Sequence, residues 1–528
     1  MIMFRFESYS SISNRSLARD VLCVTVILFV LGYVQAEAIT VCEEGCNYID
    51  IASGVAAASS GDIIEVYSGT YRENVNVTKP IVLQGVDTGD GRPVVDAGKI
   101  GSAITLSADG IAIDGFEVRN AVGNPFIDWA GIKVVSDDNI ISNNLAINND
   151  NGIFLKELFN NSLSGNNATR NTNGIRLERS NNNVVNVNYL AGNNYGLRLT
   201  SSANNNLTGN LATDNDHGIL LESSEGNGLR DNRMYGNSHN FGADGANNVS
   251  KDNLVDNKPI YYLVEANGLV IDSSSQAGTF YCIDCSNVTA KDLDLKNNLN
   301  GIFLRNTTNS RLENNRISNN SCGIKLISSP KNVIRNNEIS NNIVDGLSLD
   351  SSDNNTIENN TALQNHHYGM SILYSFGNTI TMNNISINNN GLGINYSSDN
   401  SILKNDFSFN KNNGLLLKNS SYNNIFSNSL SNNSKGAWLI FSFMNAIDGN
   451  EIYGNIDGIR LEFSGNNTMS KNKIGENGNG IAYDIKYINL YNDNDLHRNK
   501  ENKTEISSRT TASGPGGRVS THRDGSKS

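Results

Sequence analysis

Two glutamates occupy corresponding positions in two similar segments of the chain, Glu178 in GIRLE and Glu222 in GILLE. If these segments are strands two places apart in a parallel stack, about 9 to 10 Å separates them. That distance is near the upper limit for a carboxyl pair in which one acid protonates a leaving group and the other activates water. The chemistry that this pair would support is therefore hydrolysis of a glycosidic bond.

Arginines on the same outward face argue against that chemistry. Arg176 and Arg198 stand in the column beside the glutamates, where their charges hold both carboxyl groups ionised, although the reaction needs one of them protonated. An open sheet face also lacks walls that exclude water. We therefore expect a solvated, charge-balanced face that cleaves nothing and binds at most an acidic or neutral glycan weakly.

A second candidate surface lies nearer the C-terminus, where Trp438 and Arg460 recur in one outward column beside Ile440 and Glu462. A tryptophan that faces solvent beside Arg and Glu suits stacking on a sugar ring, with the polar groups holding hydroxyls. A capping contact or a protein interface explains the same residues equally well. Trp438, Arg460 and Glu462 are therefore candidates for binding, with the ligand left open.

All of these residues belong to a repeat of about 22 residues. Its unit is Leu-x-x-Asn-x-Ile-x-x-Asn, two or three residues, and then Gly-Ile-x-Leu. The glycine recurs at Gly131, Gly152, Gly174, Gly196 and Gly218, and again at Gly301, Gly323, Gly346, Gly369, Gly391, Gly414, Gly436, Gly458 and Gly480. Apolar residues that alternate in such short runs are typical of strands with one buried face. One unit cannot bury that face alone, so the units must stack.

Asparagines form two further columns of the repeat, represented in one unit by Asn315 and Asn320. Because the units stack in register, each corner asparagine lies above another and can donate to it and accept from it. We expect Asn405 and Asn428 to be buried and joined in this way. The repeat predicts an all-β, right-handed parallel β-helix. A leucine-rich repeat fits less well, because no segment supplies its helical convex side.

The cysteines fall into two close pairs, Cys42 with Cys46 and Cys282 with Cys285, while Cys322 is left over. An exported protein can form disulfides. No histidine or second cysteine pair completes a four-ligand metal set beside either pair. We therefore expect two local disulfides and no metal site.

Composition and the N-terminal segment place the protein outside the cytoplasm. The 528-residue chain has a formal net charge of −12 and no basic run, which excludes nucleic acid as a partner. Residues 1–38 have the charged, apolar and small-residue zones of a secretory signal, and no later stretch is suited to cross a membrane. We expect an extracellular, cell-surface or periplasmic protein; a retained N-terminal anchor is the alternative.

Irregularities in the repeat divide the mature chain. Residues 39–100 should form an N-terminal cap and the first coils, because a solenoid needs its open end covered. Regular coils follow over 101–257 and 301–490, and residues 258–300 should form irregular coils or a protruding hairpin. The polar segment 491–528 is expected to be a disordered tail.

The segments SGDIIEVYSGTYRENVNVTKPIVLQG and NKPIYYL, together with the asparagine-rich repeats, resemble the NosD-type parallel β-helix proteins over about residues 39 to 490. That group includes a periplasmic copper-processing accessory protein of nitrous oxide reductase, archaeal surface proteins, and β-helices that bind or hydrolyse carbohydrates. The resemblance is specific for the fold, whereas one fold supports many functions.

The resemblance implies two activities that this sequence matches only in part. The β-helix hydrolases carry carboxylates and a His-Gly on adjacent coils, and Asp216, His217 and the following glycine match the last element. The segment NTN at 171 to 173 has asparagine where those enzymes carry an Asp, and the next coil, NNYG at 193 to 196, lacks their Asp pair. We therefore expect His217 to be a solvent-facing corner residue. For copper, the scattered His, Met and Cys residues form no recognisable ligand set, so no metal or cofactor is assigned.

These observations favour an exported envelope or cell-surface protein that binds polysaccharide or neighbouring surface-layer components without catalysis. One rival is a polysaccharide hydrolase or lyase that uses the face from Arg176 to Glu222. The other is a metal-handling accessory protein like the NosD namesake.

Overall fold

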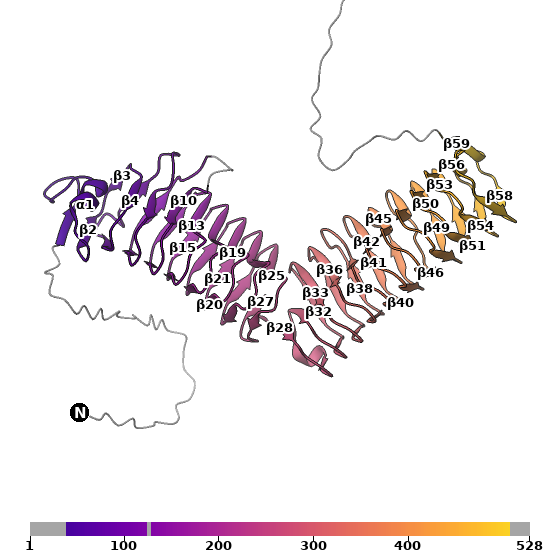
Figure 1. Ribbon diagram of the computed structural model, residues 1–528, viewed down its shortest axis with the longest axis horizontal. Helices are drawn as coiled ribbons and strands as arrows, with labels where there is room; N and C mark the ends of the chain where they lie inside the picture. The colour runs from indigo at the N-terminus through magenta and orange to yellow at the C-terminus, as the bar shows by residue number, and fades with distance from the viewer. Residues whose placement is uncertain (1–37, 124–127, 507–528) are drawn as a thin grey trace, which may run out of the picture.

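Short strands and tight corners alternate throughout the described chain, which comprises residues 38–123 and 128–506 of a computed structural model (Figure 1). They form a β-solenoid of about 21 turns, spaced about 22 residues apart, with 2% of the residues helical. Figure 1 shows two straight stacks, here called the first stack (38–257) and the second stack (258–506), which meet at an angle. The expected β-helix is confirmed. The expected secretory signal falls on residues outside the described ranges, apart from residue 38.

The longest strands of the turns form one continuous face on each stack. On the first stack, the first long-strand face contains β4 (Val75–Val77), β7 (Ile104–Leu106), β10 (Ala130–Val134), β13 (Asn151–Lys156), β16 (Asn173–Glu178), β19 (Tyr195–Thr200), β22 (His217–Glu222) and β25 (His239–Ala243). On the second stack, the second long-strand face contains β28 (Lys258–Val264), β30 (Thr279–Ile283), β33 (Asn300–Arg305), β36 (Cys322–Ile327), β39 (Leu347–Asp350), β42 (Tyr368–Leu373), β45 (Asn390–Asn395), β47 (Asn413–Lys418), β50 (Lys435–Ile440), β53 (Asp457–Glu462), β56 (Asn479–Asp484) and β59 (Glu501–Ile506). Neighbours within each face are parallel and in register, so residues at equal repeat positions stand in columns.

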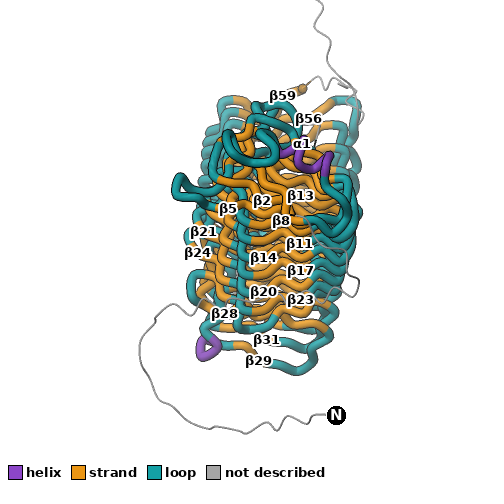
Figure 2. The backbone as a smooth tube through the Cα atoms, turned by 90° about the vertical axis from the view of Figure 1, so that its left-hand side faces the viewer, coloured by secondary structure: helices purple, strands orange, loops and turns teal. Residues whose placement is uncertain are grey.

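Two sheets of shorter strands complete the first stack, and Figure 2 shows one of them in layers from β2 to β23. That sheet contains β1 (Ala38–Val41), β2 (Ile63–Tyr67), β5 (Val82–Val86), β8 (Ala112–Asp114), β11 (Ile140–Ser142), β14 (Ser162–Ser164), β17 (Val184–Asn186), β20 (Asn206–Thr208), β23 (Gly228–Arg230) and β26 (Asn248–Val249). The other contains β3 (Thr70–Tyr71), β6 (Val94–Asp96), β9 (Glu117–Arg119), β12 (Leu145–Ile147), β15 (Asn167–Thr169), β18 (Tyr189–Ala191), β21 (Leu211–Thr213), β24 (Arg233–Tyr235) and β27 (Leu254–Val255).

The second stack is closed by two equivalent sheets. One contains β29 (Val270–Ile271), β31 (Thr289–Lys291), β34 (Arg311–Glu313), β37 (Val333–Arg335), β40 (Thr356–Glu358), β43 (Thr379–Thr381), β46 (Ser401–Leu403), β48 (Asn424–Phe426), β51 (Ala446–Asp448), β54 (Thr468–Ser470) and β57 (Leu490–Asn492). The other contains β32 (Asp294–Lys296), β35 (Arg316–Ser318), β38 (Glu338–Ser340), β41 (Thr361–Leu363), β44 (Asn384–Ser386), β49 (Ser429–Ser431), β52 (Glu451–Tyr453), β55 (Lys473–Gly475) and β58 (Asp495–His497).

A helix covers the N-terminal end of the first stack. Helix α1 (Ile51–Ala57) begins after Asp50, whose side chain accepts a hydrogen bond from the Ser53 amide at 2.7 Å. This is an N-cap, which satisfies one of the free amides of the first turn. The helix buries Ile51 and Val55 against the first coil. Apolar surface that would otherwise face water at the end of the solenoid is thereby covered.

The core consists of the inward members of each alternating strand. In β16, Ile175 and Leu177 are fully buried, whereas Arg176 between them points outward. The stacking of such residues forms one apolar cluster in each stack. Burial of a Leu or Ile side chain contributes about 1.5 to 3 kcal/mol, so the columns supply most of the driving force for stacking.

The two stacks are joined by a packed elbow. Strand β27 pairs with β28 in antiparallel fashion, and the Tyr262 and Tyr281 rings stack at 5.2 Å beside the core of the first stack. Arg305 forms an ion pair with Glu225 at 3.1 Å. Close approach here requires a glycine, because a Cβ at Gly242 would lie 2.6 Å from Leu299. The angle between the stacks is therefore set by buried contacts.

The asparagine ladder is confirmed at the predicted pair. Asn405 and Asn428 are 2% and 1% exposed, respectively. The Asn428 Oδ1 atom accepts from both the backbone amide and the Nδ2 of Asn405, at 2.9 and 3.0 Å. The Asn405 Nδ2 also donates to the Ile380 carbonyl at 2.9 Å. Each rung thus satisfies backbone groups that the corner would otherwise leave unpaired.

The repeat analysis missed two further ladders. A third asparagine column includes Asn400 and Asn423, in which the Asn400 amide donates to the Asn423 Oδ1 at 3.0 Å. A serine column includes Ser397 and Ser420, joined by an amide-to-hydroxyl bond of 3.2 Å. The third asparagine column and the serine column lie just before the short strand that carries the Ile column. They were missed because short polar residues in that position resemble the ordinary composition of a loop.

The coils continue beyond residue 490, where the tail was predicted to begin. Strands β58 and β59 pair in parallel with β55 and β56, so the described stack extends to residue 506. Asn494 and Asn499 accept from the ladder residues one coil earlier, at 3.1 and 3.0 Å from the amides of Asn472 and Asn477. Backbone pairing and the ladder maintain this coil although its side chains are polar.

One predicted disulfide is present and the other is wrong. Cys42 and Cys46 are bonded, whereas Cys282 and Cys285 are free and buried. Cys282 stands in the inward apolar column, beside Leu304 of the next strand. Cys285 takes the place of a ladder serine: its amide donates to the Thr307 hydroxyl at 3.3 Å and its thiol to the Ile283 carbonyl at 3.3 Å. The two thiols thus belong to different columns of the repeat, although their side chains contact each other.

Candidate functional site

The carboxylate of Glu178 on the first long-strand face is surrounded by cations. Its oxygens lie 2.7 Å from Arg176, 3.0 Å from Arg179 and 3.5 Å from Lys156, and its side chain is 13% exposed. Asp128 extends this cluster through contacts with Lys156 and Arg176, and the Asp128 carboxylate raises the pKa of Lys156. Glu178 is therefore the shared partner of three cations on this face.

Glu222 belongs to a separate cluster. It accepts a hydrogen bond from Arg198 at 2.8 Å and one from the Thr200 hydroxyl at 3.4 Å. The Arg198 guanidinium also lies over the Tyr195 ring, 4.6 Å from its centroid. The predicted candidates Arg176, Glu178, Arg198 and Glu222 thus share one face but form two ion-pair clusters. Within the described ranges, no hydrogen bond or ion pair joins Glu178 to Glu222.

His217 is half-buried in a column of rings, in contrast to the expected solvent-facing corner. It begins β22 and stacks between Tyr195 at 4.9 Å and His239 at 4.8 Å, while Asp216 remains exposed. Burial lowers the pKa of both imidazoles, that of His239 to about 4. The pair is therefore neutral at pH 7. His239 follows His217 by 22 residues and is paired with it in register. The column was not recognised in the sequence because the segment after His239 lacks the Gly-Ile-x-Leu pattern.

The second long-strand face brings the C-terminal candidates together. Trp438 of β50 is paired in register with Arg460 of β53. Arg460 donates to Glu462 at 2.6 Å and to Asp457 at 2.9 Å. The Lys435 ammonium lies over the indole, 4.5 Å from the ring centroid, and burial lowers the pKa of Lys435. The face thus presents an outward aromatic ring bordered by a fixed guanidinium–carboxylate network.

The corner that follows this face carries aromatic residues that the repeat analysis overlooked. Tyr374, Tyr396, Phe441 and Phe463 each stand immediately after a long strand. Tyr374 and Tyr396 stack at 5.2 Å, and Phe441 and Phe463 stack at 4.7 Å. The signal was present in the sequence, because an aromatic residue directly follows four of the long-strand segments from residue 368 onward.

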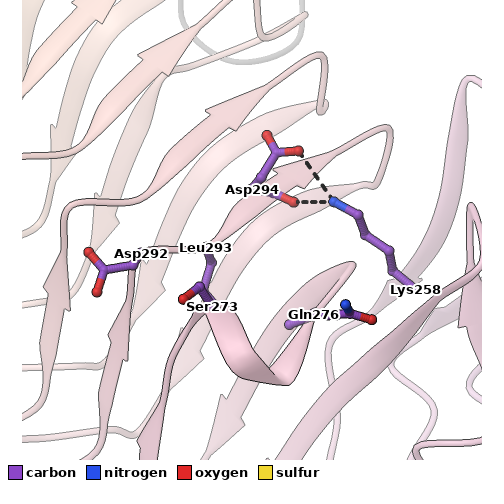
Figure 3. Close-up of a pocket in the computed structure, with 7 residues that line it drawn as sticks. Lys258, Ser273, Gln276, Asp292, Leu293 and Asp294 are labelled. Carbon is purple, nitrogen blue, oxygen red and sulfur yellow. Dashed lines mark hydrogen bonds and ion pairs between the residues drawn. The ribbon is translucent and has the colours of Figure 1, made fainter.

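A pocket of about 350 Å³ opens at the elbow (Figure 3). Lys258 of β28 donates to the carbonyl oxygen and the carboxylate of Asp294, at 3.0 and 3.3 Å. Gln276 and Ser273, from the 3₁₀ helix η1 (Ser273–Ser275) and its cap, form the opposite wall. The cation and the anion neutralise each other, and Asp292, which also lines the pocket, accepts a hydrogen bond from the Asn314 side-chain amide at 3.2 Å.

The matching family profile, described as Periplasmic copper-binding protein (NosD), covers residues 56–261 and 246–414. The chain is a member of the NosD family. A second profile, described as a right handed beta helix region, matches residues 390–514, so the solenoid of this NosD-family chain is right-handed. Among curated proteins, none matches the chain. In the described ranges, no helix is long and apolar enough to cross a bilayer.

Solved β-helix structures are similar to this NosD-family chain at low identity. The A-module of the Azotobacter vinelandii mannuronan C-5 epimerase AlgE4 is 13% identical, with 89% of this chain and 96% of that chain covered and a TM-score of 0.35. The periplasmic alginate epimerase AlgG is 12% identical, with 77% and 84% covered and a TM-score of 0.34. Pectin methylesterase from carrot is 12% identical, with 54% and 83% covered and a TM-score of 0.22. These likenesses concern the fold and carry no argument about activity.

The family description calls for a test of copper ligands in this chain. Among the described residues, no three His, Cys, Asp or Glu side chains converge on one point. His217 and His239 stack face to face without a third donor, and His367 is paired with Asp345 at 3.1 Å. Cys282 and Cys285 serve the core columns. This donor set does not fit a copper site, so no copper chemistry is assigned.

Proposed function

We propose that this NosD-family protein is exported and binds polysaccharide on the second long-strand face, without cleaving it. The observation that carries the proposal is the outward Trp438, which stands on an open parallel sheet beside the Arg460–Glu462 pair. An indole supplies a flat apolar surface for the C–H face of a sugar, and fixed charged groups supply hydrogen bonds to hydroxyls.

The surroundings of Trp438 support a role in binding. The Lys435 side chain lies over the ring and is partly desolvated there. A flexible lysine can swing away at small energetic cost, so a sugar ring can replace it and restore its ammonium to water. The Arg460 guanidinium is anchored by Asp457 and Glu462, which leaves it preorganised for a ligand hydroxyl or carboxylate.

The first long-strand face supports the absence of cleavage. Hydrolysis requires one protonated and one ionised carboxyl group on either side of a bond. Glu178 contacts three cations and Glu222 is bonded to Arg198. Both carboxylates therefore already serve as partners in ion pairs.

The test is a screen of the purified protein against neutral and acidic polysaccharides, with binding and reducing-end release measured in the same samples. We expect binding that is lost in Trp438→Ala and retained in Glu178→Gln, and no release of reducing ends. Release that disappears in Glu178→Gln or Glu222→Gln would establish the hydrolase instead. Failure of every polysaccharide to bind the wild type would remove the proposed function.

A further inference from the structure

The aromatic corner of the second stack holds bulky residues in a backbone conformation that disfavours them. Tyr374, Tyr396, Phe441 and Phe463 have φ angles of 47°, 48°, 50° and 49°. Left-handed backbone is strained for residues with a large side chain. Three of these rings are also 42 to 50% exposed. Folding does not require rings at this corner, because Ser328 and Ser351 occupy the same position in earlier coils.

One coil interrupts the row of rings. The corner residue between Tyr396 and Phe441 is Asn419, with a φ of 51°. The register is fixed by corner amides: Tyr396 donates to the Lys418 carbonyl and Asn419 to the Ile440 carbonyl, each at 3.0 Å. Because Tyr396 stacks on Tyr374 and Phe441 on Phe463, each has its other ring face turned toward the coil of Asn419. Tyr396 and Phe441 therefore flank Asn419, one coil away on either side, and the space over Asn419 between the two rings is here called the slot.

The width of the slot follows from the strand spacing. Tyr396 and Phe441 are two coils apart, so about 10 Å separates their ring planes. A ring in van der Waals contact with a neighbour on each side needs about 7 to 8 Å, and two rings need more than about 10 Å. The slot therefore admits one ring, which must lie parallel to the coils.

The floor of the slot is polar and unoccupied by protein partners. Asn419 is half-buried, and its side-chain amide makes no hydrogen bond to another described residue. A carboxamide offers two donors and one acceptor, which match neighbouring hydroxyls on a sugar. A purely aromatic ring in the slot would leave this amide without partners, which favours a sugar over an aromatic side chain of a partner protein.

We propose that the slot between Tyr396 and Phe441 binds a single pyranose ring, whose C–H faces contact the two aromatic rings and whose hydroxyls bond to Asn419. This inference rests on the proposed function and names a subsite for it, adjoining the face that carries Trp438. Because the bound ring lies across the stack axis, the sugar is a chain terminus or a side branch. A linear chain that runs along the stack presents its rings in the wrong plane.

The experiment fills the slot. Asn419→Tyr places a third tyrosine where the two preceding coils already hold Tyr374 and Tyr396, so the backbone tolerates it. Saturation-transfer NMR is recorded with a panel of neutral methyl pyranosides and one branched polysaccharide. We expect transfer to the ring C–H protons in the wild type, and at least a ten-fold loss of affinity in Asn419→Tyr and in Phe441→Ser. Thermal unfolding of both variants should stay within a few degrees of wild type.

The matched control is Asn306→Ala, compared with Asn419→Ala. Asn306 stands at the same corner with a φ of 50°, between Asp284 and Ser328, where no rings flank it. Both changes place alanine at a similar positive φ, and Asn306→Ala also removes a 2.9 Å hydrogen bond to Asp284, but only Asn419→Ala should reduce binding. Asn419 begins an Asn-Ser-Ser sequon and Asn306 an Asn-Thr-Thr sequon, so intact mass is measured first.

The proposed slot is overturned if no pyranoside binds the wild type, if Asn419→Tyr binds as well as the wild type, or if Asn419 carries an attached glycan. Binding of an aromatic peptide side chain in place of every sugar would also overturn it. The proposed function fails separately, when no polysaccharide binds or when Trp438→Ala leaves binding intact. If Trp438→Ala abolishes polysaccharide binding but Asn419→Tyr does not change it, the proposed function stands and the proposed slot is wrong.

Discussion

Replacement of Asn428 by alanine tests the ladder at its best-defined rung. The side chain accepts from the amide and Nδ2 of Asn405, and its own Nδ2 donates to Ile402, Phe426 and Asn450, at 2.9 to 3.2 Å. Asn405 Nδ2 keeps the Ile380 carbonyl, Asn450 Oδ1 keeps the Asn428 amide, and the Ile402 carbonyl keeps its place in the ladder between β46 and β48, so one buried group, the Asn405 amide, loses its partner. An unpaired buried group of this kind costs about 1 to 3 kcal/mol.

The assay is urea unfolding combined with hydrogen exchange of residues 400–450. A solenoid is stabilised largely by contacts between neighbouring repeats, so the loss should be greatest in the coils that flank residue 428. The control is Asn412→Ala, because Asn412 is exposed and its side chain makes no hydrogen bond within the described ranges. Equal stability of the two variants, within 0.5 kcal/mol as an order-of-magnitude limit for surface changes, would refute the ladder argument.

The remaining predictions concern charge, protonation and thiols. Glu178→Gln should lower stability without creating or removing hydrolysis, because it breaks three ion pairs of a 13%-exposed carboxylate; a change in reducing-end release would contradict this. Because the pKa of His239 is depressed to about 4 in the folded state, the unfolded state binds the proton more tightly. The contribution of neutral His239 to the free energy of unfolding is therefore fully present above about pH 6.5 and is lost as the pH drops toward 4, by about 3 kcal/mol in all. Burial of His217 acts in the same direction, Asp216 opposes it, and His239→Phe should flatten the profile measured by thermal unfolding. Burial raises the pKa of Cys322, so an alkylating reagent should modify it, like Cys282 and Cys285, only after unfolding, as judged by mass spectrometry.

The repeat made the fold predictable because each unit obeys one rule at each position. The spacing of Gly174 and Gly196, and of Asn405 and Asn428, fixes strand length, register and corner in one step. Prediction failed where a column contains mixed residues. Cys285 stands in a serine column and was assigned to a disulfide, because a CxxC pattern is a stronger local signal than a ladder hidden among polar loops.

The candidate site was less predictable for a physical reason. Alternation told us that Arg176 and Trp438 point outward, but not which neighbours their charges or rings would meet. Glu178 forms an ion pair with Arg179, which stands at the corner after the strand. Arg176, another partner of Glu178, also contacts Asp128, which lies in a loop. Neither Arg179 nor Asp128 belongs to the outward column, so alternation could not reveal them. The aromatic corner was invisible to an argument about strands, because its residues follow the strands and carry left-handed backbone.

The most direct test of the central claim measures polysaccharide binding and reducing-end release for the wild type, Trp438→Ala and Glu178→Gln under the same conditions. The structure predicts binding by the wild type and by Glu178→Gln, loss of binding in Trp438→Ala, and no release of reducing ends from any of the three. Release by the wild type that vanishes in Glu178→Gln, with binding unaffected by Trp438→Ala, would contradict the account.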